Sequence, residues 1–155
     1  MKRVFLNASQ NKKGNTATLA HQAFGKLSYS TINLVDYHID QLGQKSRSDQ
    51  FSSVIEQLFD ADILIIGTPV YWRDMTGYLK TFIDRLAELE TSSAGLDAAR
   101  LKGIDVYLII QGSNPKDAIP GIVNVISHVC RYFRMRYKGL LRNTKEAKSA
   151  QKHLV

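Results

Sequence analysis

Cysteine is nearly absent from this chain: Cys130 is the single example among 155 residues. One cysteine can neither close a disulfide within the chain nor hold an iron–sulfur cluster, which normally needs four thiolates. Long apolar runs are also missing, since none approaches the roughly 20 residues that cross a bilayer, and the first residues lack the layout of a secretory signal peptide. We therefore expect a cytoplasmic protein that does not use a membrane.

The sequence patterns of metal sites and of serine hydrolases are missing as well. The four histidines, His21, His38, His128 and His153, are scattered, with neither a His-x-x-x-His nor a Cys-x-x-Cys spacing, so we expect no metal site. No Gly-x-Ser-x-Gly sequence marks a nucleophile elbow. Cys130 falls on the apolar side of a predicted helix, where we expect a buried and unreactive thiol.

The net charge of +7 is unevenly distributed. Residues 1–130 contain 13 basic and 13 acidic residues, which cancel. The last 25 residues contain eight basic residues against one acidic residue, Glu146, and so carry the whole excess. We expect a solvated basic surface there, and the alternative is contact with an anionic partner such as a phosphate, a lipid or, less favoured, a nucleic acid.

Short apolar runs alternate with helical patterns along the chain, whose 44% hydrophobic content is typical of a folded globular protein. The predicted strands are Lys2–Asn7, Thr31–Val35, Ile63–Ile66, Ile104–Ile110 and Tyr137–Leu141. The first predicted helix is capped by Asn15 and Thr16. The other predicted helices are Gln50–Phe59, a helix whose apolar face runs from Met75 to Leu86, and Pro120–Phe133. The segments expected to be irregular are Asp36–Ser48 and, as a surface loop, Glu88–Arg100. Lys145–Leu154 is either a short basic closing helix or a frayed end.

Strands built of uniform apolar runs and separated by helices predict a parallel sheet that is covered on both faces. Right-handed crossovers leave few arrangements of five such strands, and the order 2-1-3-4-5 accommodates them. No repeat, linker or domain boundary is visible. We therefore expect one α/β domain over residues 1–155, a three-layer α/β/α sandwich of the flavodoxin-like type.

A polar loop joins the first predicted strand to the first predicted helix. It contains Ser9, Asn11, Gly14, Asn15 and Thr16, which offer two hydroxyls, two amides and a glycine where the backbone can approach a ligand. Because a helix N-terminus has unpaired N–H groups and a partial positive charge, this loop suits a phosphate. It is neither a Walker A loop nor a Gly-x-Gly-x-x-Gly loop. The alternative is a polar turn with an ordinary helix cap.

Two further loops follow predicted strands, at the end of a parallel sheet where ligands collect. The first contains Thr68, Pro69, Val70, Tyr71 and Trp72, and continues to Asp74. Its proline stiffens the turn, and its aromatic rings offer flat apolar contact, although Trp72 could instead pack across a subunit contact. The second loop contains Gln111, Gly112, Ser113 and Asn114, a pattern that is also common after strands without a ligand.

The Pro69–Trp72 segment and the run Leu79-Lys80-Thr81-Phe82-Ile83-Asp84-Arg85 together resemble the flavin-contacting loop of the flavodoxin-like NAD(P)H-dependent FMN reductases. The Ser9–Thr16 loop resembles the Ser-x-x-x-x-Gly-Asn-Thr loop with which that family holds the FMN phosphate. The resemblance extends from Lys2 to Gly112. It places the Thr68–Trp72 loop against the ribityl chain and the isoalloxazine ring, and the Gln111–Ser113 loop on the far side of the ring.

The resemblance implies a flavoprotein enzyme that binds FMN and uses NADH or NADPH as its co-substrate. Hydride would pass through the flavin to a quinone, a nitro or azo compound, or free flavin, with no essential catalytic side chain. It also implies a homodimer. The alternative is a flavodoxin-type electron carrier, although such carriers are usually acidic and this chain is basic. A protein without flavin that uses its basic tail for interaction is a third class.

Overall fold

The computed structural model describes residues 1–91 and 96–155, and its strands and α-helices alternate along the chain. The strands are β1 (Arg3–Asn7), β2 (Ser30–Asn33), β3 (Ile63–Pro69), β4 (Asp105–Gln111) and β5 (Arg136–Leu141). The α-helices are α1 (Asn15–Phe24), α2 (Phe51–Leu58), α3 (Gly77–Arg85), α4 (Ile119–Tyr132) and α5 (Thr144–Ala150). The 3₁₀ turns are η1 (Leu34–Asp36), η2 (Leu86–Thr91), η3 (Ala98–Leu101) and η4 (Gln151–His153).

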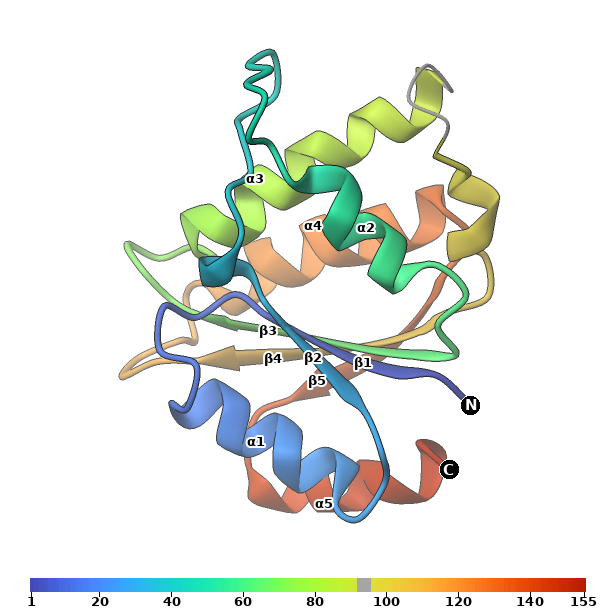
Figure 1. Ribbon diagram of the computed structural model, residues 1–155. Helices are drawn as coiled ribbons and strands as arrows, with labels where there is room; N and C mark the ends of the chain where they lie inside the picture. Colours follow the sequence, from blue (N-terminus) through green and yellow to red (C-terminus); the bar gives the residue numbers. More distant parts are fainter. Residues whose placement is uncertain (92–95) are drawn as a thin grey trace.

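The strands form a parallel sheet in the order β2-β1-β3-β4-β5, which confirms the predicted order. Helices α2, α3 and α4 lie on one face of the sheet, and α1 and α5 lie on the other (Figure 1). The predicted three-layer flavodoxin-like sandwich is therefore correct. Within the described residues, no helix combines the length and the apolar character needed to cross a membrane.

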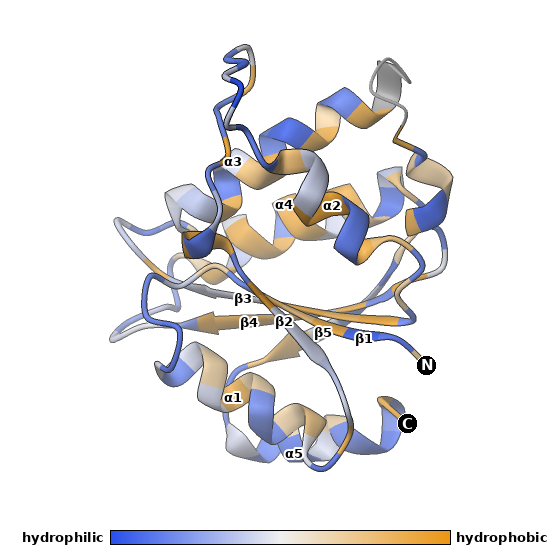
Figure 2. Ribbon diagram, in the orientation of Figure 1, coloured by the Kyte–Doolittle hydropathy of each residue, from blue (hydrophilic) through white to orange (hydrophobic). Residues whose placement is uncertain are grey.

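The core consists of two apolar layers, one on each face of the sheet (Figure 2). Side chains of successive strand residues point to opposite faces. In β3, Leu64 and Ile66 pack under α2, α3 and α4, whereas Ile63 and Ile65 pack toward α1 and α5. Both sets are buried, which explains why the central strands are apolar at every position rather than at every second one.

Most predicted element boundaries differ from the observed ones by one residue, and three differences are larger or change a helix cap. Strand β2 ends at Asn33 rather than Val35, because its ladder partner β1 ends at Asn7. Strand β3 continues past Ile66 to Pro69, because Gly67–Pro69 pair with β4. The predicted cap of α1 is wrong: Gly14 occupies the cap position without a side-chain hydrogen bond, and Asn15 and Thr16 are the first helical residues.

Two segments are more ordered than the sequence indicates. The expected surface loop Glu88–Arg100 contains parts of η2 and η3, and buries Leu89 and Leu96; its residues 92–95 lie outside the described residues. At the C-terminal end, Ala147, Ala150 and Leu154 are buried against the α1 side of the sheet. The second alternative for Lys145–Leu154, a frayed end, is therefore wrong: α5 is a packed helix whose lysines remain exposed.

Candidate cofactor-binding site

The three loops predicted as ligand-binding lie together at the carboxyl edge of the sheet, on the left in Figure 1. The amide of Ala8 donates to the carbonyl of Gly67 at 2.8 Å, which joins the loop after β1 to the end of β3. The amide of Val70 donates to the carbonyl of Gln111 at 2.8 Å, which joins the loop after β3 to the loop after β4. The sheet therefore assembles one site from segments that are far apart in the sequence.

The loop between β1 and α1 is folded by its own side chains. The side-chain carbonyl of Asn7 accepts from the amide of Ser9, the hydroxyl of Ser9 from the amide of Asn11, and the side-chain carbonyl of Asn11 from the amide of Lys13, each at 3.1 Å. Short polar side chains that bond to the backbone two residues ahead favour such turns. The loop thus approaches α1 with a preformed backbone.

The first turn of α1 offers the donors that a phosphate needs. Its N-terminal N–H groups have no acceptor within the helix, and neither a capping side chain nor an acidic residue is present in the first turn. The Thr16 side chain is buried there, and its hydroxyl makes no hydrogen bond within the described residues. Nearby, Lys12 pairs with Asp36 at 2.9 Å. This donor set fits a phosphate dianion.

Gly67 brings the first turn of α1 close to β3. A Cβ atom at Gly67 would lie 2.5 Å from the Thr16 methyl carbon and 2.8 Å from the Phe5 ring, distances that real side chains do not adopt. The absence of a side chain at this position therefore determines where Thr16 lies. The loop motif in the sequence indicates Thr16, but no sequence pattern indicates its contact with Gly67.

Thr76 is a supporting residue that the sequence analysis missed. Its hydroxyl donates to the carbonyl of Ala8 at 2.8 Å and accepts from the amide of Leu79 at 3.3 Å, so it caps α3 and ties that helix to the first loop. Its amide donates to the hydroxyl of Thr68 at 3.1 Å. Thr68 is itself fully buried, so its hydroxyl is used within the protein. A threonine three residues before Leu79 was the available capping signal.

The loop after β3 ends in a tight hairpin from Tyr71 to Asp74. The amide of each of these two residues donates to the carbonyl of the other, at 3.0 and 3.1 Å. The two central residues, Trp72 and Arg73, have φ angles of 50° and 66°. Glycine or asparagine normally occupies such positions, and a side chain there costs about 1–3 kcal/mol. Trp72 is 99% exposed at the tip, and Tyr71 is 44% exposed.

The loop after β4 lies beside this hairpin. Gly112 and Ser113 are exposed, and a Cβ atom at Gly112 would lie 3.4 Å from the Val70 Cβ. Arg73 forms an ion pair with Asp117 at 3.1 Å. The side-chain amide of Gln111 donates to the carbonyl of Arg142 at 3.2 Å, which also brings the start of α5 to this edge. The last contact joins elements that the sequence patterns treat separately.

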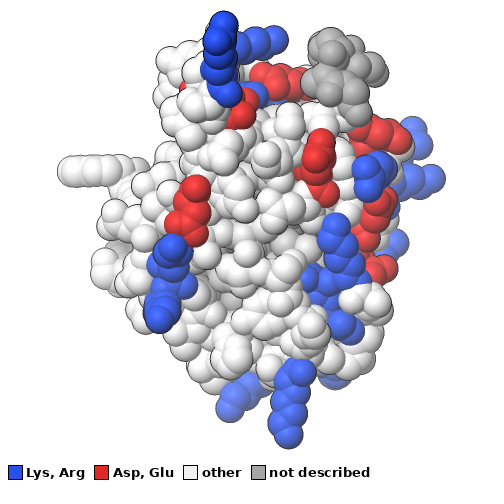
Figure 3. Space-filling model, in the orientation of Figure 1, with Lys and Arg blue, Asp and Glu red and all other residues white. Residues whose placement is uncertain are grey.

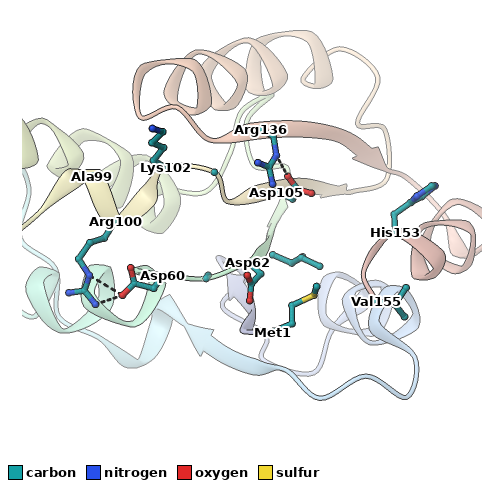
Figure 4. A pocket seen from close by; sticks show the side chains of 13 residues that line it. Met1, Asp60, Asp62, Ala99, Arg100, Lys102, Asp105, Arg136, His153 and Val155 are labelled. Carbon is teal, nitrogen blue, oxygen red and sulfur yellow. Dashed lines mark hydrogen bonds and ion pairs between the residues drawn. The ribbon is translucent and has the colours of Figure 1, made fainter.

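A cavity of about 430 Å³ at the opposite edge of the sheet is a competing location (Figure 4). Its charged lining is largely paired: Arg100 contacts Asp60, and Arg136 contacts Asp105. Cofactors in open parallel sheets bind outside the carboxyl ends of the strands, and this cavity lies at the amino ends of β3, β4 and β5. We therefore favour the carboxyl edge.

Neither a metal site nor a reactive thiol is apparent in the part of the chain that the structure describes. Within the described residues, no group of three or more histidine, cysteine, aspartate or glutamate side chains is arranged to hold a metal ion. Cys130 is buried in α4, and burial raises the pKa of its thiol to about 11. A thiol with this pKa is almost entirely protonated at neutral pH and is a poor nucleophile.

Comparisons with known proteins agree with the geometry. The family model for NADPH-dependent FMN reductases matches residues 1–102. A Bacillus subtilis protein named "Putative NAD(P)H-dependent FMN-containing oxidoreductase YwqN" is 30% identical over 149 residues, which cover 90% of this chain and 82% of that protein.

Solved structures share the fold over nearly the whole chain. The Trp repressor binding protein from Bacillus subtilis matches with a TM-score of 0.77 and 26% identity, over 99% of each chain. An FMN-dependent NADH-azoreductase from Bacillus anthracis, solved in complex with FMN, matches with a TM-score of 0.66 over 99% of this chain and 96% of that chain. Its 14% identity supports the shared fold alone.

Proposed function

Since the chain belongs to the NADPH-dependent FMN reductase family, we propose that it passes hydride from NAD(P)H through bound FMN to a quinone, a nitro or azo compound, or free flavin. It is an oxidoreductase that uses FMN and NAD(P)H. The observation that carries the site assignment is the uncapped first turn of α1, which lies at the same edge as an exposed aromatic hairpin.

In this proposal each of the three loops contacts a different part of FMN. The residues that hold the phosphate are Ser9, Asn11, Gly14, Asn15 and Thr16. The residues along the ribityl chain and one side of the ring are Thr68, Pro69, Val70, Tyr71 and Trp72, and those across the ring are Gln111, Gly112 and Ser113. Hydroxyls and backbone N–H groups suit the phosphate, and the aromatic side chains suit the ring.

FMN supplies the redox chemistry, since it accepts two electrons from a nicotinamide and delivers them to an acceptor. The chain's own groups bind and orient. The α1 N–H groups and the Thr16 hydroxyl bind the phosphate end of FMN. Gly67 sets how closely the first turn of α1 lies against β3, and so positions Thr16. The Tyr71–Asp74 hairpin borders the ring. We assign no acid or base role to any side chain.

A flavodoxin-type electron carrier is the alternative that the family assignment disfavours. Net charge also separates the two classes, because small carriers of that type are usually acidic, whereas this chain carries +7. A carrier would bind FMN without oxidising NAD(P)H by itself. Steady-state oxidation of NADH and NADPH by the purified protein with menadione as acceptor therefore distinguishes them, and an absence of turnover would favour the carrier.

The direct test is the visible spectrum of the purified protein after incubation with FMN. We expect flavin absorption bands that bleach when NAD(P)H is added without oxygen, and release of FMN rather than FAD on heating, identified by chromatography. A protein that takes up no FMN, or that retains FAD, would contradict the proposal.

We also propose a homodimer. Large apolar side chains are exposed on the carboxyl edge and on the α3–α4 side, and a second copy would cover some of them. These side chains are Leu42, Tyr71, Trp72, Tyr78 and Tyr132. Sedimentation velocity over a range of protein concentrations tests the assembly, and a species of about 17.5 kDa at every concentration would contradict it.

A further inference from the structure

Resting on the proposed function, we propose that Arg73 and Asp117 are positioning residues whose ion pair, here called the Arg73–Asp117 latch, sets the placement of the Trp72 hairpin beside the flavin ring. The two residues come from opposite loops, after β3 and after β4, which project from the same end of the sheet (Figure 1). The latch therefore spans the two loops that border the proposed ring site.

The base of the hairpin is held firmly, but its tip is not. Val70 is fixed by its hydrogen bond to Gln111 and lies against Gly112. Beyond Tyr71, the chain turns through two residues in the left-handed region, and Trp72 is 99% exposed, so packing does not fix the indole ring. Within residues 1–91 and 96–155, Arg73–Asp117 is the one ion pair that connects this tip to the neighbouring loop.

Asp117 is a stable support for the latch. It lies in a turn in which the amides of Ala118 and Ile119 both donate to the carbonyl of Pro115, at 3.0 and 3.1 Å. Ala118 is buried at the start of α4. Asp117 therefore moves with α4, whereas Arg73 moves with the hairpin, so their ion pair determines how far the hairpin lies from the ring site.

Both latch residues are largely exposed, with side-chain exposures of 77% and 61%, so salt should weaken their attraction. Loss of such a pair changes an equilibrium by up to roughly fivefold. We therefore expect the latch to affect the reaction with the acceptor and the environment of Trp72, while the phosphate-binding turn of α1 continues to hold FMN.

The test compares the FMN-loaded wild type with Arg73→Ala, Asp117→Ala and the exchange variant Arg73→Asp/Asp117→Arg. Trp72 is the single tryptophan of the chain, so its emission reports the hairpin directly. In each single variant we expect weaker quenching of Trp72 by bound FMN, a rise of about two- to fivefold in the KM for menadione, and an FMN Kd within about twofold of the wild type. The exchange variant should restore quenching and KM.

The matched control is Arg100→Ala, which breaks an exposed ion pair between Arg100 and Asp60 at the amino edge of the sheet (Figure 4). It should leave quenching and KM unchanged. Raising the salt from 0.05 to 0.5 M should move the wild type toward the single variants and leave those variants unchanged.

Three results would overturn the latch: unchanged quenching and KM in both single variants, equal changes in Arg100→Ala, or failure of the exchange variant to restore either quantity. If the wild type binds FMN, any of these results leaves the proposed function intact. A wild type that binds no FMN would overturn both proposals.

Discussion

At the scale of single residues, Thr16 has two side-chain groups, a methyl and a hydroxyl, whose contributions can be tested separately. Its methyl group packs where a Cβ at Gly67 would otherwise lie, and its hydroxyl has no partner within the described residues. Replacement by alanine would remove both groups and would disturb the packing between α1 and β3. Valine keeps the methyl group and removes the hydroxyl, so it isolates the contribution of the hydroxyl to ligand binding.

We predict that Ser9→Ala combined with Thr16→Val lowers FMN affinity at least tenfold. Each charge-assisted hydrogen bond to a phosphate contributes about 1.5–3 kcal/mol, and about 1.4 kcal/mol corresponds to a factor of ten. Fluorescence titration with FMN measures the Kd, and circular dichroism checks the fold. Riboflavin, which lacks the phosphate, is the matched ligand, and its affinity should not change. An unchanged FMN Kd would remove both hydroxyls from the site.

Arg85 is the most heavily bonded charged side chain described in the structure. Only 3% of the Arg85 surface is exposed. Its guanidinium donates to both carboxylate oxygens of Asp49, at 2.8 and 2.7 Å. It also donates to the carboxylate of Glu88 at 2.8 Å and to the backbone carbonyl of Asp40 at 2.9 Å. It also lies 4.7 Å from the centre of the Phe51 ring. These contacts tie the polar segment between β2 and α2 to α3.

We predict that Arg85→Met lowers the free energy of unfolding by about 3–5 kcal/mol at pH 7, because it leaves partly buried carboxylates without their cation. Urea denaturation measures the change. Arg100→Met, at an exposed ion pair, is the control and should lower the free energy of unfolding far less, because solvent screens that pair. Equal effects of the two substitutions would show that the buried cluster contributes no more than a surface pair.

The same cluster predicts a pH dependence. The hydrogen bond from Arg85 lowers the pKa of Asp49 below its usual 3.8. A carboxyl with a lowered pKa in the folded state contributes stability that is complete above its unfolded pKa and is lost as the pH falls through the folded value. Between pH 5 and pH 2.5, the wild type should therefore lose stability more steeply than Asp49→Asn. Parallel urea-denaturation profiles would contradict this.

At the scale of elements, the C-terminal segment 144–154, which contains α5 and η4, separates a packing face from a charged face. Ala147, Ala150 and Leu154 are buried on the α1 side, while Lys145, Lys148 and Lys152 are exposed. Figure 3 shows basic side chains without acidic ones at the lower end of the molecule, where Figure 1 places α1 and α5. The start of α5 lies at the cofactor edge, because the side-chain amide of Gln111 donates to the carbonyl of Arg142. A role of these lysines in nucleotide binding therefore calls for a direct test.

We predict that replacing Lys145, Lys148 and Lys152 together by glutamine leaves the ratio of the KM values for NADPH and NADH unchanged. The reason is that these lysines lie on a solvated face, where any anion binding is weak and depends on salt. Steady-state kinetics with both nucleotides measures the ratio. A selective rise in the KM for NADPH would instead make this face part of the 2′-phosphate site.

At the scale of the whole molecule, FMN binding should stabilise the fold. At a free concentration 100 times the Kd, a ligand of the native state adds about 2.7 kcal/mol. For a chain of this length, about 1 kcal/mol raises the melting temperature by roughly 2–4 °C. We therefore predict a rise of about 5–10 °C in calorimetry, with one cooperative transition if residues 1–155 form one domain. Two separate transitions would contradict that domain assignment.

The sequence alone determined the layout of the fold, because the signals for it are local. Apolar runs and helical spacings identified all five strands, and the parallel order followed from general rules of connection. The residue types of the three loops were visible because each loop is continuous along the chain. The end of β2 at Asn33 and the extension of β3 to Pro69 depend on pairing with neighbouring strands. The ends predicted from the sequence for these two strands were therefore wrong.

Only the tertiary structure decided which side chains support the site. Thr76 reaches Ala8 from 68 positions away in the sequence, and Arg85 reaches Asp49 from 36 positions away. The Arg73–Asp117 latch joins loops that follow different strands. No periodicity or motif encodes such pairs, because their partners are brought together by the packing of the sheet and its helices. The cofactor class could therefore be inferred from contiguous motifs, while the contacts that position those motifs required the fold.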